Sequence, residues 1–186
     1  MQILSAAFIL LHLLGGCSPK SEGGLVYTRY EVEEANVSLE VPSGWRRFGA
    51  RWNGYGGAPK GPAFTRFIAQ SEPQHEGVIL GAYLSLTRVV KKEDRTDSED
   101  ALFSKNIPGV TKGSLGGIET REYLTEYRYK IDDETTAGID VPMKSEGIVF
   151  NRPDAYFILE YRANTQVYDK YRPALDRAKA SLTFES

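Results

Sequence analysis

Side chains that commonly carry chemistry are scarce in this chain of 186 residues. It has one cysteine, Cys17, and His75 is the only histidine beyond its apolar N-terminal segment. A lone thiol can form neither an internal disulfide nor a cysteine-based zinc site, although it can carry a covalent group. Ser-His-Asp catalysis would depend on His75 alone, and the sequence has no Gly-x-Ser-x-Gly motif. The sequence therefore indicates no catalytic constellation.

Two acidic segments could hold a metal ion. His75 lies between Glu72 and Glu76, but one imidazole with two carboxylates is a poor ligand set. Residues 91–100 (KKEDRTDSED) are rich in carboxylates, yet their spacing lacks the central glycine and distal glutamate of an EF-hand. We interpret both segments as solvated, and we expect no metal and no cofactor.

The residues before Cys17 suggest a role for its thiol. Residues 3–14 are almost entirely apolar, which is too short for a bilayer span of about 20 residues but typical of an export signal. This run ends in Leu14-Gly15-Gly16-Cys17, which resembles the bacterial lipobox. The resemblance implies cleavage after Gly16, lipidation of Cys17 and acylation of the new amino group. A buried N-terminal helix with a packed free cysteine is the alternative.

These features divide the chain into three parts. Residues 1–16 are the expected signal peptide, residues 17–24 a lipidated cysteine with a polar tether, and residues 25–186 a single exported domain. Several acyl chains anchor a protein firmly where one holds only marginally, so we expect a lipid-anchored envelope protein on a periplasmic or outer-membrane face. No Lys or Arg precedes Ile3, so either the signal relies on its α-amino charge or translation starts upstream.

Residues 46–62 combine basic and aromatic side chains with five glycines, and we predict that they form a long loop. The side chains expected to contact a partner are Arg46, Arg47, Arg51, Trp52, Tyr55 and Lys60. Such side chains on a loop suit an envelope protein, an anionic lipid headgroup or a glycan. Alternatively, Phe48 and Trp52 only cover one end of a sheet. Nucleic acid is not an expected partner, because the formal net charge is -2.

Hydropathy patterns predict the elements that position these residues. Strands are expected at 37–41, 64–70, 78–90, 123–131, 146–151 and 155–162, with 78–90 in the centre of the sheet. A short helix is expected between residues 96 and 106, and an amphipathic helix over 167–182 that Pro173 kinks unless it begins near Arg172. Short connections imply antiparallel pairing, so the predicted class is α+β.

A row of tyrosines, at positions 123, 127 and 129, lies within the strand predicted at 123–131. We expect these rings to form core beneath a helix, and the alternative is a surface on which sugars stack.

The two ends of the exported domain share a second resemblance. Residues 37–45 (VSLEVPSGW) form a strand followed by Pro-x-Gly-Trp, and residues 155–161 (AYFILEY) precede a helix and the closing Ser-Leu-Thr-Phe. Both patterns resemble the PsbP-type fold. The resemblance implies an α/β/α sandwich around a twisted antiparallel sheet and no enzyme activity. The family includes photosystem accessory proteins and bacterial lipoproteins.

Three functions remain open at the level of sequence. The leading hypothesis is a lipid-anchored, non-enzymatic binding or assembly module of the cell envelope. An envelope enzyme that uses carboxylates on glycans is the second, and two buried carboxylates about 5–10 Å apart in one cleft would favour it. A photosystem-associated accessory protein is the third.

Overall fold

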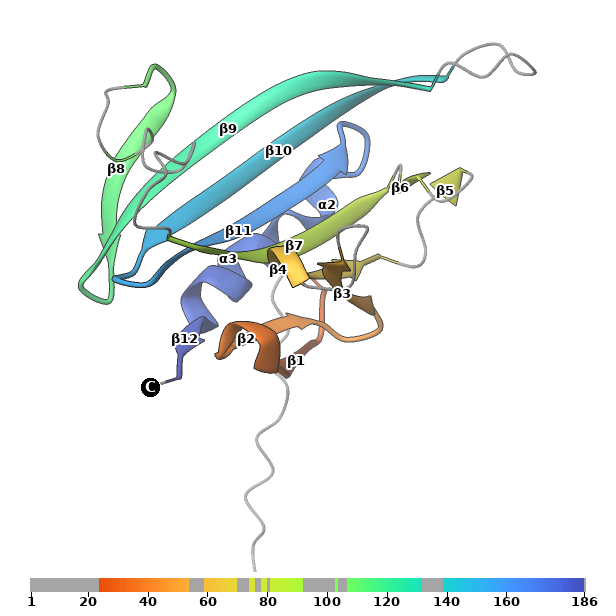
Figure 1. Ribbon diagram of the computed structural model, residues 1–186. Coiled ribbons are helices and arrows are strands. Elements are labelled where there is room, and N and C mark those ends of the chain that lie inside the picture. The colour runs from red at the N-terminus through yellow and green to blue at the C-terminus, as the bar shows by residue number, and fades with distance from the viewer. Residues whose placement is uncertain are drawn as a thin grey trace, which may run out of the picture.

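A computed structural model describes residues 24–53, 59–69, 74–75, 78–79, 81–91, 103, 107–131 and 139–185. Its main element is a seven-stranded antiparallel sheet (Figure 1). In spatial order this sheet contains β3 (Arg46–Asn53), β4 (Pro59–Ile68), β7 (Ala82–Val90), β11 (Ala155–Asn164), β10 (Ile139–Asn151), β9 (Ile118–Ile131) and β8 (Val110–Leu115). A second sheet contains β1 (Tyr27–Val32), β2 (Val37–Pro42) and β12 (Thr183–Phe184), and β5 (Gln74–His75) pairs with β6 (Val78–Ile79).

The three-stranded sheet and three helical elements lie on one face of the seven-stranded sheet (Figure 1). These three helical elements are η1 (Glu33–Ala35), α2 (Tyr168–Tyr171) and α3 (Pro173–Ser181). The hydrophobic core fills the space between these layers, with Leu39 from β2, Leu84 and Leu159 from the large sheet and Leu175 from α3. The regular helix α3 begins at Pro173, so the prediction of a start near Arg172 holds and the predicted kink does not occur. Proline fits this position because the backbone N–H of a first-turn residue has no partner within the helix.

The C-terminus completes the core. The ring of Phe184 meets the rings of Phe150 and Phe157 edge-on, at centroid distances of 5.5 and 5.0 Å. Trp45, from the Pro-x-Gly-Trp motif, packs edge-on against Tyr171 at 5.7 Å. Both motifs that suggested the fold therefore supply aromatic side chains to the same core.

The predicted strands are confirmed, with different boundaries. β4 begins at Pro59 rather than Phe64, and the strand predicted at 78–90 is divided into β6 and β7. β7 lies between β4 and β11, which confirms its central place. The fold is dominated by sheet. Of the helix predicted between 96 and 106, only Phe103 lies among the described residues, where it is helical and stacks on Tyr156 at 5.4 Å.

The predicted loop at 46–62 is wrong, because its two ends form a β-hairpin. Arg46 pairs with Ile68 and Phe48 pairs with Arg66. Residues 63–68 of β4 pair with β3, and this pairing satisfies backbone groups that a glycine-rich loop would leave to water. A register shift between Arg51 and Asn53 absorbs the local irregularity.

Among the described residues, no helix has the length and apolar character needed to cross a membrane.

Candidate functional site

The hairpin β3–β4 separates the residues that we expected to act together. Arg46 and Arg47 are adjacent in a strand, so their side chains leave opposite faces of the sheet. The Arg46 guanidinium lies 4.3 Å from the centroid of the Phe48 ring, while Arg47 Nη1 donates a 3.1 Å hydrogen bond to the carbonyl oxygen of Glu31. Both arginines are exposed. One face of this edge therefore presents Arg46 and Phe48, and the other presents Arg47.

The structure tests the other predicted contact residues only in part. Arg51 and Trp52 belong to β3 and Lys60 to β4, so their backbones lie at this edge of the sheet, and their side chains are outside the description. Tyr55 lies outside the described residues. So do Gly16 and Cys17, and the lipidation of Cys17 therefore stays a prediction.

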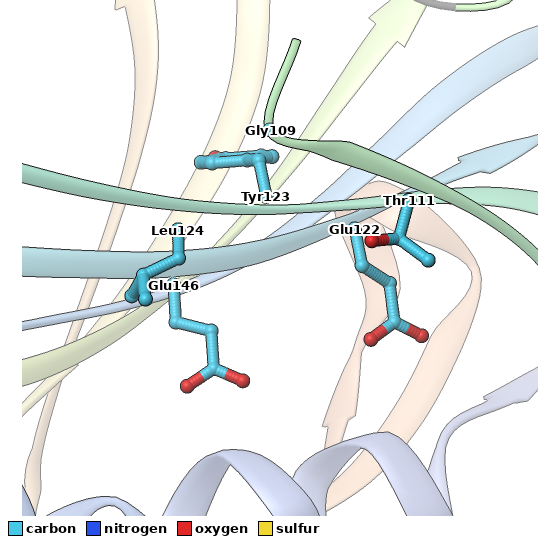
Figure 2. Close-up of a pocket in the computed structure, with 6 residues that line it drawn as sticks. All are labelled: Gly109, Thr111, Glu122, Tyr123, Leu124 and Glu146. Atoms are coloured by element: carbon cyan, nitrogen blue, oxygen red, sulfur yellow. The ribbon is translucent and has the colours of Figure 1, made fainter.

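The tyrosine row on β9 faces away from α2 and α3, and Tyr129 is 39% exposed, so the expectation that the row forms core beneath a helix is wrong. Neighbouring Glu122 accepts a 2.5 Å hydrogen bond from Lys179 Nζ of α3, which fixes the even-numbered residues of β9 on the helical side. Tyr123 must then face the opposite side, and Figure 2 shows it leaving the strand away from Glu122 and Glu146. Helix-facing positions on this strand carry charge instead.

A network centred on Glu160 holds Tyr123 in place. Glu160 Oε1 accepts hydrogen bonds from Tyr123 Oη at 3.0 Å, Ser145 Oγ at 2.7 Å and Arg162 Nη2 at 3.0 Å. Burial raises the pKa of Tyr123, and the neighbouring Glu160 carboxylate raises it further. Tyr123 therefore stays protonated and donates to Glu160. This network links β9, β10 and β11 across the sheet.

Gly147 makes this network sterically feasible. A Cβ atom at Gly147 would lie 2.4 Å from Cζ and 2.5 Å from the hydroxyl oxygen of Tyr123. The tyrosine ring therefore crosses β10 directly above the glycine backbone. A larger residue at this position would displace the ring and break its bond to Glu160.

On the helical side, a cleft of about 220 Å³ lies beside β8, β9 and β10 (Figure 2). Its lining residues are Gly109, Thr111, Glu122, Tyr123, Leu124 and Glu146. Glu122 and Glu146 both point toward the helices, and Leu124 is 53% exposed. The cleft is smaller than the roughly 300–1,000 Å³ of sites for drug-sized ligands, so it suits a single side chain or a small ligand.

Both cleft carboxylates pair with cations from the C-terminal helical segment. Glu146 accepts from Arg172 Nε at 2.9 Å, Arg172 Nη2 at 2.6 Å and Tyr168 Oη at 2.7 Å. Burial alone would raise the pKa of Glu146, but the hydrogen bonds from Arg172 and Tyr168 outweigh it and lower the pKa below its ordinary value. Glu146 is thus ionised, whereas a general acid needs a raised pKa.

Metal-site predictions stay largely untested. Among the described residues no group of three or more His, Cys, Asp or Glu side chains could hold a metal ion. The backbone of His75 belongs to β5, while Glu72, Glu76 and residues 92–100 lie outside the described part.

The sequence pointed to none of the three residues that organise these two sites. Glu146 and Glu160 lie in predicted strands and Glu122 directly precedes one, and a carboxylate in an alternating pattern normally indicates only a solvated face. The alternation of Glu122, Leu124 and Glu126 was the available signal, since it gave this strand a polar side.

No protein-family model matches the sequence, and no curated protein has a detectable match. Solved structures do resemble it. The solution structure of cyanobacterial PsbP (CyanoP) from Synechocystis sp. PCC 6803 matches with a TM-score of 0.51 and 14% identity, over 92% of this chain and 98% of that one. This similarity supports a PsbP-like fold, as the motifs at the two ends of the domain indicate.

Two other structures were also found. A protein from Bacteroides thetaiotaomicron VPI-5482 matches with a TM-score of 0.50 and 12% identity over 85% of this chain, which spans 48% of that protein. LpqN, described as involved in cell envelope biogenesis of Mycobacterium tuberculosis, gives a TM-score of 0.38 and 17% identity, over 87% of this chain and 92% of that one.

Proposed function

We propose that this protein is a lipid-anchored, non-enzymatic binding or assembly module of the bacterial cell envelope. The main support for a non-enzymatic role is that both carboxylates of the cleft are paired with side chains of the C-terminal helices. Glu122 is engaged by Lys179, and Glu146 by Arg172 and Tyr168. These carboxylates stabilise the packing of the C-terminal helices on the sheet, and Glu146, whose pKa is lowered, is not prepared to donate a proton.

The alternative of a carboxylate enzyme has one observation in its favour, since two carboxylates do line a single cleft. Glycosidases of this type need one carboxyl group protonated while the other is ionised. The lowered pKa of Glu146 opposes that division of roles. A photosystem-associated role draws only on the likeness to cyanobacterial PsbP, which concerns the fold.

The anchor is supported by the lipobox-like sequence ending at Cys17. Bacteria expressing the full chain with labelled palmitate should incorporate label into the wild-type protein and retain it in the membrane fraction. The Cys17→Ala variant should lose both the label and the membrane retention. Equal labelling and fractionation of the two proteins would show that the lipoprotein assignment is wrong.

The contact surface at the β3–β4 hairpin can be tested separately. Phe48 on β3 is 38% exposed, and Tyr129 on β9 is 39% exposed, so the two aromatic side chains make a matched pair. A photo-crosslinking amino acid at position 48 should capture a discrete envelope component in intact cells, and the same amino acid at position 129 should not. Equal capture at both positions would contradict a specific contact at the hairpin.

A further inference from the structure

The two edges of the seven-stranded sheet differ in how they are protected. Among the described strands, β3 and β8 each have one neighbour, so each leaves backbone donors and acceptors along one side. β3 carries the exposed Arg46 and Arg47 and a register shift after Arg51. Charges and irregular register are devices by which natural sheets prevent further strands from adding.

β8 lacks most of these devices. Its six residues, VTKGSL, pair regularly with β9 from Val110↔Tyr123 to Leu115↔Ile118. It contains no proline, and Lys112 is its only charged residue. Residues 111–114 are exposed. Within the described part of the chain, β8 is therefore a regular edge with β9 as its one neighbour, and an extended chain can pair on its other side.

The cleft lies directly beside this edge. Thr111 is opposite Glu122 in the β8–β9 register, and both line the cleft on the helical side. A residue of an added strand placed beside Thr111 would point to the same side, because neighbouring residues in a sheet share a face. Its side chain would then enter the cleft.

The chemistry of the cleft favours a long basic side chain. Exposed Leu124 offers an apolar surface for a methylene stem, and Glu122, whose side chain is 41% exposed, offers a carboxylate near it. Among the described residues, the hydrogen bond that Glu122 accepts comes from Lys179 and ends on Oε1. Lysine and arginine commonly lay the stem on apolar surface while the charged head stays in a polar environment.

We propose that β8 accepts an extended segment of a partner polypeptide as an eighth strand, with a lysine or arginine beside Thr111 entering the cleft. This names a binding surface for the module proposed above and rests on that function only in treating the protein as a binding module. Neither the anchor nor the β3–β4 hairpin enters the argument. Failure of palmitate labelling would leave it unaffected.

The test uses the full chain in detergent and an acetylated nine-residue peptide of alternating threonine and valine with one central lysine. Bound peptide should slow hydrogen exchange of the backbone amides in β8 and leave those of β3 unchanged. A peptide with the same side chains but N-methylated at alternate amides should bind at least tenfold more weakly, because it cannot complete the ladder. Equal binding of the two peptides, or protection of β3 instead of β8, would overturn the proposal.

Protein variants test the basic side chain. Glu122→Gln should weaken the lysine peptide about two- to fivefold, the size of a partly exposed ion pair. Glu126→Gln is the matched control, since Glu126 lies on the same face of β9 and pairs with Lys144 at 3.0 Å outside the cleft. Equal effects of the two variants would contradict the assigned role of Glu122. Dimers that protect the β8 amides without peptide would assign this edge to a second copy and refute a partner.

Discussion

The contact between Gly147 and Tyr123 leads to a quantitative prediction about the sheet. Replacing Gly147 with alanine places a methyl group 2.4 Å from Cζ of Tyr123, well inside van der Waals contact. The displaced atoms are the far end of a ring that crosses β10, so the ring rather than the backbone must move. That movement breaks the hydrogen bond from Tyr123 Oη to Glu160.

Three contributions set the magnitude. Overpacking in a well-packed region costs about 1–3 kcal/mol. Losing a hydrogen bond to a charged acceptor costs about 1.5–3 kcal/mol. Alanine in a strand interior recovers about 0.5–1 kcal/mol relative to glycine. We therefore expect Gly147→Ala to lower the free energy of unfolding by about 2–5 kcal/mol.

Urea denaturation followed by tryptophan fluorescence is a suitable assay, because Trp45 is buried against Tyr171 in the core. A double-mutant cycle separates the clash from any general effect of the methyl group. In the Tyr123→Ala background the ring is absent, and Gly147→Ala should be neutral or stabilise by about 0.5–1 kcal/mol.

The control variant Tyr123→Phe keeps the ring and removes only the hydrogen bond to Glu160. It should lower the free energy of unfolding by less than Gly147→Ala does. If Gly147→Ala costs the same in the wild-type and Tyr123→Ala backgrounds, the steric reasoning is refuted.

Three further predictions concern the helical side. The lowered pKa of Glu146 means that its contribution to stability is present above its ordinary pKa of 4.5 and is lost as pH falls through the folded-state value. Denaturation between pH 6 and pH 3 should therefore show a smaller loss of stability in Glu146→Gln than in the wild type, and equal slopes would contradict this. Phe184→Ala should lower the free energy of unfolding by about 2–3 kcal/mol in thermal melts, because its ring contacts Phe150 and Phe157 and is only partly buried. Pro173→Ala should change it by less than about 1 kcal/mol, since the residue occupies the first turn of α3, and a larger loss would show that proline has another role.

The hydropathy pattern was sufficient for most of the strands, because each alternation reflects a side-chain environment that local sequence records. The hairpin of β10 and β11 and the start of α3 at Pro173 follow from such local signals. The pairing of β3 with β4 does not, because a glycine-rich stretch becomes a strand only when a suitable neighbour lies beside it. Here that neighbour is β4, and its position depends on the pairing of the other strands in the sheet.

The direction of the tyrosine row illustrates the same limit. Periodicity shows that Tyr123, Tyr127 and Tyr129 share one face of a strand, yet it cannot say which face the helices cover. An apolar-aromatic row is normally assigned to the core, and here the charged row of Glu122 and Glu126 faces the helices instead. Lys179 on α3 explains this arrangement, since it supplies Glu122 with a counter-ion that lies far away in the sequence.

The two edges of the sheet change the meaning of the basic residues at 46–60. Composition suggested that Arg46, Arg47 and their neighbours contact a partner, but arginines along an edge strand also discourage backbone pairing. Both roles are compatible when the contact is made by side chains, as a cation stacked on Phe48 would allow. On β8 the opposite holds, because Lys112 is its only charged residue and Thr111, Gly113 and Ser114 are small.

If both proposals are correct, salt should weaken binding at the β3 edge strongly, whereas binding at β8 should depend mainly on peptide N–H groups. Screening affects exposed charges far more than hydrogen bonds between backbones. Crosslinking from position 48 at rising ionic strength, compared with peptide binding to β8 under the same conditions, tests this difference directly.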